Sequence, residues 1–443
     1  MKKIIKYFKH ISFVLSSLLL FYFIYESEIY LRGTNREYYF SYYFVLSAII
    51  LFSSISFVSK ENLKSYLKII FISIIFTLYM TESYLTFFND PLKNRIVIYK
   101  KKTGNSYDTR TIFEIYEDLY KKDKTVVIDV PPAYHLDKKN NTLIPLAGIS
   151  NSKTVNCNEN GYYSMYQSDR FGFNNPDNEW DKKNIEFFLV GDSYAQGECV
   201  NRPNDMTSVL RKLSKKSALN LGYASSGPLV EYATLREYLR PNVKNVIWIY
   251  FEYNDLNDLN RELKNKTLNK YLQNLSFIQN LKFKQNEINE INRTVVRQQK
   301  EMRRDQSVKN KNIKHKILKF IRLNKLKNNI QKEIPLKKKS NTFDDFHKIL
   351  KNAKDLSNKN KSNFYFVYLP EFSRYKSKYN NDTYKKIKTI VGKLNIPFID
   401  IDKEVFKKES NPLELFPFEL PGHYNVKGYK KVSEAIYNFI LDQ

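Results

Sequence analysis

Cysteine is scarce in this chain: among 443 residues there are only two, Cys157 and Cys199. Two cysteines cannot supply a disulfide scaffold, and neither lies in a CxxC or another metal-ligand spacing, so the sequence predicts no metal site. They can either form one bridge in an oxidising compartment or stay free and buried. Stability must therefore come from a packed core, for which a hydrophobic content of 42% is sufficient.

Acidic residues are few in relation to basic ones: 46 Asp and Glu stand against 73 Lys and Arg, which gives a net charge of +27. A charge of this size on one soluble domain would indicate a nucleic acid or an anionic surface as the partner. The excess is local, because the segment from Lys264 to Lys339 alone has a net excess of about 17 positive charges. The total charge therefore does not define a function.

Three apolar stretches open the chain, and the second has no charged residue. Each is close to the ~20 residues that cross a hydrocarbon core of about 30 Å. They run over residues 11–31, 38–58 and 67–88. A cleaved signal peptide is the rival interpretation of the first stretch, since basic residues precede it, but no small-x-small cleavage site follows. We expect three retained transmembrane helices within residues 1–90.

Basic residues also predict the orientation of these helices. The lysine-rich N-terminus favours a start inside the cytoplasm, and three crossings then place the chain after about residue 90 on the outer side. Lys93 and Arg95 oppose this orientation, but charges at the head of a long translocated domain count for less. The soluble part is therefore expected outside the cytoplasm.

Strand-like and helix-like patterns alternate after residue 160. Short apolar runs predict buried parallel strands at 184–190, 219–221, 245–251, 363–369 and 396–401. Helical patterns follow most of these runs, and the last helix is expected at 427–441. The alternation is typical of a doubly wound sheet with helices on both faces, which binds ligands outside the carboxyl ends of its strands.

The domain boundaries follow from these patterns. Residues 91–155 form a connecting region, and residues 156–443 form the α/β domain. A basic, mostly helical insertion interrupts this domain at about 262–340. Its apolar stripe in a lysine-rich background suits an anionic membrane surface or an acidic glycan, and the plainer expectation is a solvated helical lid. Nucleic-acid binding is not expected, because no nucleic-acid motif is present.

Ser193 is the first candidate for chemistry. The turn Gly191-Asp192-Ser193 directly follows the first predicted strand and would present the serine at the start of a helix. The backbone amide of a serine in this position points with the helix N-terminus, which favours an oxyanion. The plainer interpretation of such a serine is a helix N-cap.

Further candidates follow the next strands. Gly222 and Gly227 lie after the second strand and permit close backbone approach to a ligand. Asn254 follows the third strand and offers an amide donor at the same edge of the sheet. His423 lies between the last strand and the last helix, where a loop histidine can reach a serine at the end of the first strand.

The order Ser193, Gly227, Asn254 and His423 resembles the four sequence blocks of the SGNH, or GDSL-type, hydrolases over roughly residues 160–443. The resemblance implies a three-layer α/β/α, flavodoxin-like fold that works without a cofactor. It implies Ser193 as nucleophile, His423 as base, and an oxyanion hole made by the amides of Ser193 and Gly227 with the Asn254 side chain. Gly222 is the alternative glycine.

One position departs from the family pattern. The family usually places an aspartate three residues before the histidine to orient the imidazole, and here that position is Leu420. Glu419, Asp400 and Asp402 could reach the ring, but their spacing does not select any of them. Ser193 and His423 could also work as a dyad whose ring is oriented by a carbonyl group.

The resemblance to membrane-tethered bacterial members implies an esterase in the inner (cytoplasmic) membrane, multi-pass, with its catalytic domain in the periplasm. The expected partners are the lipid bilayer and an acylated carbohydrate or other ester. Two alternatives remain open: an O-acyltransferase that modifies a polysaccharide together with a membrane partner, and a catalytically silent envelope scaffold. A bridge between Cys157 and Cys199 would tie the preceding loop to the helix of Ser193.

Overall fold

The computed structural model describes residues 2–30, 33, 36–58, 61–88, 91–136, 143–311, 313–333, 342–376 and 379–443. These residues form two compact units. The first comprises residues 1–90 and 313–334, and the second comprises residues 91–312 and 335–443. Residues 334–340, which end the predicted insertion, lie outside the described residues.

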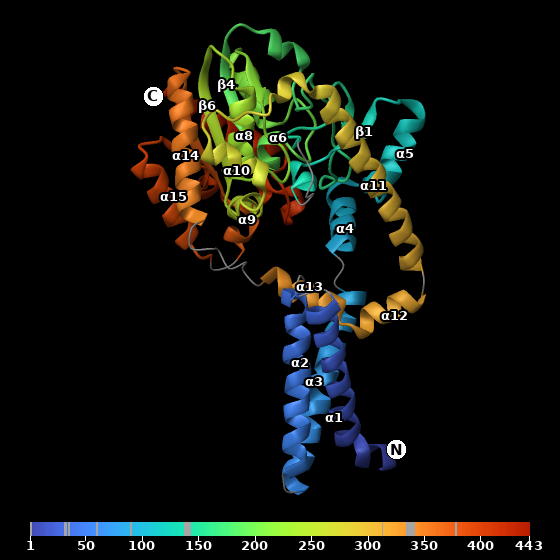
Figure 1. The fold of residues 1–443 in the computed structure, drawn as a ribbon. Coiled ribbons are helices and arrows are strands. Elements are labelled where there is room, and N and C mark those ends of the chain that lie inside the picture. Colours follow the sequence, from blue (N-terminus) through green and yellow to red (C-terminus); the bar gives the residue numbers. More distant parts are fainter. Residues whose placement is uncertain are drawn as a thin grey trace. The chain divides into compact units, whose positions relative to one another are not determined.

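Long apolar helices make up most of the first unit, drawn in blue in Figure 1. They are α1 (Lys2–Ile24), continued by a π-helical turn (Tyr25–Tyr30), α2 (Arg36–Val58) and α3 (Glu61–Phe87). Among the described residues, Phe13–Tyr30 and Ile69–Phe87 are long and apolar enough to cross a membrane. Only 11% and 6% of these two segments is buried, so neither is the core helix of a soluble domain.

The expected span at residues 38–58, in α2, is not one of these two. Among the described residues of α2, Tyr42–Ile55 is a shorter apolar segment. Two helices that meet the length and composition of a span are therefore described, together with one shorter apolar helix.

A five-stranded parallel sheet is the centre of the second unit (Figure 1). The strand order is β5-β4-β6-β7-β8. The strands are β4 (Ile185–Val190), β5 (Ala218–Asn220), β6 (Val243–Phe251), β7 (Asn363–Leu369) and β8 (Phe398–Asp400). All five coincide with the predicted apolar runs, which confirms an α/β fold with a parallel sheet. The order reverses beside β4, so the carboxyl ends of β4 and β6 border the switch point where such sheets bind ligands.

Side chains of β6 alternate between two hydrophobic clusters. Trp248 and Tyr250 pack with helices α8 (Pro228–Tyr238), α14 (Thr342–Lys359) and α15 (Asp382–Lys393). Ile247 and Ile249 pack with helices α7 (Met206–Ser214) and α17 (Val426–Leu441). Because side chains along a strand point to opposite faces, the sheet is buried on both sides, as its uninterrupted apolar strands predict.

The predicted connecting region, residues 91–155, contains regular secondary structure. It contains α4 (Pro91–Thr103), α5 (Ile112–Lys122), β1 (Val126–Ile128) and β2 (Lys153–Val155). A second sheet has the order β1-β2-β3, with β3 at Met165–Gln167. The second unit accordingly begins near residue 91, well before the predicted boundary at residue 156.

The basic insertion is divided between the two units. Helices α10 (Lys266–Gln273) and α11 (Gln285–Lys311) belong to the second unit, where Leu268, Tyr271 and Ile288 join the core. Helices α12 (Ile313–Ile321) and α13 (Asn324–Glu333) belong to the first unit. The part in the second unit is therefore packed into the core, whereas α12 and α13 keep half-exposed apolar side chains such as Ile317 and Ile330.

Short elements complete the second unit. They are α6 (Ser193–Gln196), α9 (Asp255–Glu262), α16 (Ile401–Glu404) and single 3-10 turns at Pro132–His135, Asp177–Asp181, Leu281–Phe283, Phe372–Tyr375, Phe406–Lys408, Pro412–Leu415 and Pro417–Glu419.

Candidate active site

Ser193 is placed by the tight turn between β4 and α6. Gly191 permits this turn, because a side-chain carbon there would lie 2.8 Å from Cβ of Ala195 and 2.9 Å from Cβ of Ile249. Asp192 caps the short helix by accepting a hydrogen bond of 2.9 Å from the amide of Tyr194. Ser193 is thus the first residue of α6, and Asp192 rather than Ser193 fills the N-cap position.

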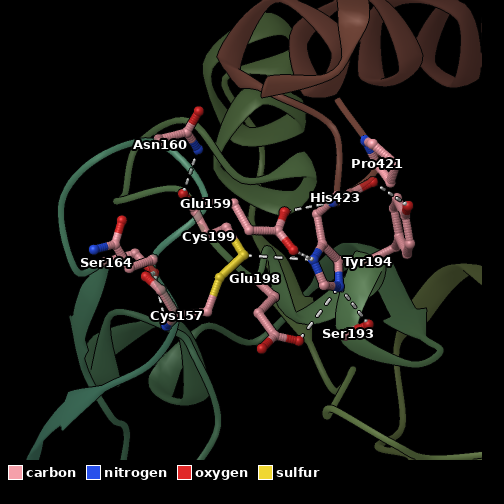
Figure 2. Close-up of polar contacts among 12 residues, drawn as sticks. Cys157, Glu159, Asn160, Ser164, Ser193, Tyr194, Glu198, Cys199, Pro421 and His423 are labelled. Carbon is pink, nitrogen blue, oxygen red and sulfur yellow. Dashed lines mark hydrogen bonds and ion pairs between the residues drawn. A yellow bond between two sulfur atoms is a disulfide. The ribbon is translucent and has the colours of Figure 1, made fainter. Parts of the chain in front are cut away.

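His423 faces this serine from the loop before α17. Its Nε2 lies 2.9 Å from Oγ of Ser193, which is hydrogen-bonding distance (Figure 2). The ring packs against Tyr194, with ring centroids 4.8 Å apart, and the Tyr194 hydroxyl donates to the carbonyl of Gly422 at 3.2 Å. Asn425 caps α17 by accepting from the amide of Gly428, which ends the loop two residues after the histidine. The structure therefore brings the predicted serine and histidine together.

Glu159 occupies the other side of the imidazole (Figure 2). Its Oε1 lies 3.3 Å from Nδ1 of His423, and its Oε2 accepts a hydrogen bond of 2.6 Å from the backbone amide of the same residue. Hydroxyl, imidazole and carboxylate thus form a continuous chain from Ser193 to Glu159. This is the arrangement in which a carboxylate fixes the tautomer and orientation of a catalytic histidine.

Several contacts hold the loop that carries Glu159. Cys157 and Cys199 form a disulfide, with Cα atoms 5.0 Å apart. Asn160 donates to the carbonyl of Cys199 at 2.8 Å, and Arg95 donates to the carbonyl of Glu159 at 2.8 Å. The loop is therefore attached on both sides of Glu159 to the segment that follows α6 and to α4.

A second carboxylate, that of Glu198, lies close to the imidazole of His423 on the side that faces Ser193. Oε2 of Glu198 lies 3.4 Å from Nε2 of His423, the same nitrogen that faces Ser193. Sγ of Cys199 lies 3.4 Å from Nδ1. Ligand atoms of Cys157, Glu159, Cys199 and His423 lie within 4.8 Å of one another, but both sulfur atoms belong to the disulfide and are not thiolate ligands.

The surrounding carboxylates change the protonation of these groups. Burial alone would lower the pKa of His423, but the charges of Glu159 and Glu198 outweigh it and raise that pKa to about 9. Burial raises the pKa of Glu198 to about 7, and burial also raises the pKa of Asp192 to about 6. For Glu159, burial acts to raise the pKa, but the His423 charge and hydrogen bonds lower it below its ordinary value. Glu159 is thus the ionised partner.

The predicted glycines are not free to stabilise an oxyanion. The Gly227 amide donates to Oε1 of Glu262 at 2.6 Å, and the Gly222 amide donates to Oδ1 of Asn220 at 2.9 Å. The loop between them contains Ser225, which adopts a left-handed φ of 56° and whose amide has no partner among the described residues. The amides of both predicted glycines are therefore engaged inside the fold.

Asn254 lies three residues after the end of β6, at the N-cap of α9. Its Nδ2 donates to Oδ2 of Asp258 at 2.9 Å, and its Oδ1 is buried without a partner among the described residues. Asp192 is also within hydrogen-bonding reach of the Asn254 side chain, which acts to lower the pKa of Asp192. This asparagine therefore borders the serine turn through Asp192.

None of the three carboxylates suggested by the sequence contacts His423 in the described structure. Glu419 forms an ion pair of 2.7 Å with Lys102. Asp400 accepts from the Tyr384 hydroxyl at 2.6 Å, and Asp402 accepts from the Tyr375 hydroxyl at 2.8 Å. Each of these carboxylates already has another partner, and Glu159 occupies the position next to Nδ1.

Sequence reasoning missed both Glu159 and Glu198. A single glutamate in a loop carries no periodic or motif signal of its own. The two cysteines did hold a usable signal, because Glu159 follows Cys157 by two residues and Glu198 directly precedes Cys199. Once a bridge between these cysteines is assumed, both glutamates must lie close to the serine turn.

No family model matches the chain, and no curated protein matches it in sequence. Among solved structures, a lipolytic protein of the G-D-S-L family from Desulfitobacterium hafniense DCB-2 is similar with a TM-score of 0.30 and 14% identity, over 58% of this chain and 99% of that one. The YXIM protein of Bacillus subtilis gives a TM-score of 0.32 and 10% identity, over 59% of this chain and 57% of that one.

Proposed function

We propose that this chain is a membrane-anchored serine esterase of the SGNH/GDSL type. The observation that carries the proposal is the chain of contacts from Oγ of Ser193 through the ring of His423 to the carboxylate of Glu159. A buried serine at the end of the first strand of a parallel sheet, paired with a base and an orienting acid, is suited to acyl transfer. The helices packed on both faces of the sheet support a three-layer, flavodoxin-like domain.

The mechanism follows from the positions of these groups. Neutral His423 takes the proton from Oγ of Ser193, and the oxygen attacks an ester carbonyl to form a tetrahedral intermediate. The same proton then goes to the leaving alcohol, and an acyl-enzyme remains. Water, activated by His423, attacks the acyl carbon and releases the acid and the free serine. Glu159 stays ionised throughout and stabilises the imidazolium form.

Stabilisation of the oxyanion is assigned to a revised set of donors. The amide of Ser193 at the start of α6 remains from the sequence prediction, and so does the Asn254 side chain through the N–H of Nδ2 that does not bind Asp258. The Gly227 amide does not, since Glu262 already binds it. The partnerless amide of Ser225, in the same loop, is the donor that we put in its place.

The membrane part of the proposal rests on the two long apolar helices of the first unit. We propose that α2 also crosses the membrane with them, which places the catalytic unit in the periplasm of a bacterial inner membrane. A disulfide beside the active site supports an extracytoplasmic location, because such bonds persist in oxidising compartments. The proposed substrate is an acylated carbohydrate of the envelope, which rests on resemblance and anchoring.

Transfer of the acyl group to a polysaccharide hydroxyl is the second candidate function. The same acyl-enzyme would serve it, with a sugar hydroxyl in place of water and with a membrane partner that supplies the acyl donor. A catalytically silent scaffold was considered because Leu420 replaces the aspartate that usually orients the histidine. Glu159 now occupies that orienting position, so this reason no longer applies. The esterase is preferred because it needs no partner.

A serine-directed fluorophosphonate probe tests the proposal on detergent-solubilised full-length protein. We expect labelling of the wild type and none in Ser193→Ala, with Ser226→Ala as a matched control from the neighbouring loop. Failure of folded wild type to react would overturn the enzyme proposal. Incubation with a model acyl donor and a glycan then separates the two reactions, since an acyl-glycan product would favour the transferase. A periplasm-active reporter fused after Gln443 tests the orientation.

A further inference from the structure

Helices α12 and α13 are the part of the basic insertion that the proposed catalytic function does not use. They belong to the first unit, with the long apolar helices. In residues 313–333 the sequence has six lysines and one arginine but one acidic residue, Glu333. A simple linker would not need two strongly basic helices that pack with apolar helices, so we asked what this pair of helices binds.

Specific polar contacts attach this pair to α3. The carboxylate of Glu82 accepts hydrogen bonds from the amides of Lys325 (3.0 Å) and Leu326 (2.7 Å), which are among the first residues of α13. Glu82 is only 1% exposed. A carboxylate in an apolar helix is costly unless it is satisfied, and the positive end of a second helix satisfies it.

Three further contacts fix α12 and α13 against the long helices. The Tyr79 hydroxyl donates to the carbonyl of Ile321 at 3.0 Å, and the ring of Tyr79 packs against Phe320 with centroids 5.8 Å apart. Nζ of Lys327 lies 4.7 Å from the ring centroid of Tyr42 in α2. Both basic helices are therefore seated at a defined height on the apolar helices.

That height lies near the C-terminal end of the apolar segment of α3. Tyr79 and Glu82 precede Phe87, the last residue of the apolar segment of α3, by about 12 and 8 Å along a helix axis. Amphipathic helices lie with their apolar face about 5–10 Å inside the boundary between headgroups and acyl chains. The seat on α3 is thus close to the depth at which an interfacial helix rests.

The surface of α12 and α13 carries both exposed apolar side chains and exposed basic side chains, which is what a helix at a membrane interface needs. Ile317, Leu318 and Ile321 lie within two turns of α12 and are 52%, 47% and 53% exposed, and Ile330 of α13 is 51% exposed. Lys316 is exposed on α12, Arg322 is exposed in the turn that follows it, and Lys325 is exposed on α13. Apolar side chains can enter the acyl region while the long basic side chains reach up to the headgroups.

We propose that α12 and α13 form an interfacial platform that binds the anionic headgroups of the bilayer in which α3 is embedded. The occupant is a lipid surface rather than an acidic glycan, because half-exposed isoleucines and leucines need an apolar medium that a glycan does not offer. The platform rests on the membrane anchoring proposed above. It gives the basic insertion a role that is independent of the chemistry at Ser193.

Spin labels measure the depth of the platform in the full-length protein in lipid nanodiscs. Because the native cysteines form a disulfide, single Ile317→Cys and Ile330→Cys variants offer one free thiol for a nitroxide. We expect both labels to collide with oxygen several-fold more than with a water-soluble nickel chelate. A Lys316→Cys label should show the reverse preference. Water-accessible labels at both isoleucines would overturn the platform.

A label on α3 separates this result from a failure of anchoring. Phe76 lies in the apolar segment of α3 and is 64% exposed. A Phe76→Cys label in lipid, with water-accessible labels at Ile317 and Ile330, refutes the platform alone. A Phe76→Cys label in water refutes the membrane anchor itself.

Lipid composition tests the charge of the platform. In nanodiscs of phosphatidylcholine mixed with phosphatidylglycerol, protein extracted in mild detergent should retain phosphatidylglycerol above its bulk fraction. The triple variant Lys316→Gln, Arg322→Gln and Lys325→Gln should fall to the bulk fraction. A matched triple of exposed lysines in the second unit should keep the enrichment: Lys212→Gln, Lys385→Gln and Lys393→Gln. Equal enrichment in all three proteins would show that these basic residues bind no anionic lipid.

Discussion

Glu159 holds His423 at two points, with Oε2 bound to its backbone amide at 2.6 Å and Oε1 at 3.3 Å from Nδ1. The carboxylate comes from a loop far earlier in the chain rather than from the residue three positions before the histidine. The role of orienting acid is therefore filled from a different place in the sequence, while the geometry around the imidazole is complete.

Replacing the carboxylate should separate this role from simple packing. We expect Glu159→Gln to lower kcat/KM by about 10²- to 10⁴-fold, because the amide cannot stabilise the imidazolium form. Glu159→Asp should recover part of the rate. Glu419→Gln is the matched control, since Glu419 pairs with Lys102 and not with the histidine. Steady-state hydrolysis of a nitrophenyl ester by the three variants measures the effect, and a wild-type rate in Glu159→Gln would refute the assignment.

The pH dependence of the rate should reveal the carboxylates around the base. With a pKa of about 9, raised against burial by Glu159 and Glu198, His423 is mostly protonated at pH 7 and cannot act as a base. The rate should therefore rise with pH up to about 9. Glu198→Gln removes one of the two charges, so the rise should move to lower pH. A profile of kcat/KM that is unchanged in this variant would contradict the coupling.

The same shift has a consequence for stability. A folded-state pKa of His423 above its ordinary value of 6.5 means that the folded state binds the proton more tightly than the unfolded state. This contribution is fully present below about pH 6.5 and is lost as the pH rises through about 9. Thermal unfolding of wild type and His423→Gln across this range measures it. The difference between their Tm values should diminish as the pH approaches and passes about 9.

Sequence patterns predicted the central sheet well, because buried parallel strands are continuous apolar runs and each run here is followed by polar residues. Ser193 and His423 were found for the same reason, since both follow such strands. Glu159 was missed because its contact with the histidine spans 264 positions and leaves no local pattern. The division of the basic insertion between two units depends on tertiary contacts such as that of Glu82 with α13, which periodicity does not report.

The Asn254 side chain offers a test of the revised oxyanion hole. Asn254→Ala should reduce kcat by about 10²- to 10³-fold, the usual loss for one donor, with a small change in KM. Asn257→Ala is a close control, because its amide binds the carbonyl of Tyr253 one turn away. Single-turnover acylation with a chromogenic ester separates the acylation step from product release. Equal acylation rates in the two variants would remove Asn254 from the mechanism.

The disulfide should couple redox conditions to activity. The bond closes a loop of 42 residues, and in the loop-entropy model this stabilises the fold by about 4 kcal/mol. It also holds Glu159 and Glu198, which flank it in sequence, against the imidazole. We expect dithiothreitol to lower Tm and the rate of fluorophosphonate labelling at Ser193. The double variant Cys157→Ser with Cys199→Ser should start at the low labelling rate and not respond to dithiothreitol. If that variant labels as fast as the oxidised wild type while still showing the lower Tm, the bond stabilises the fold without positioning Glu159.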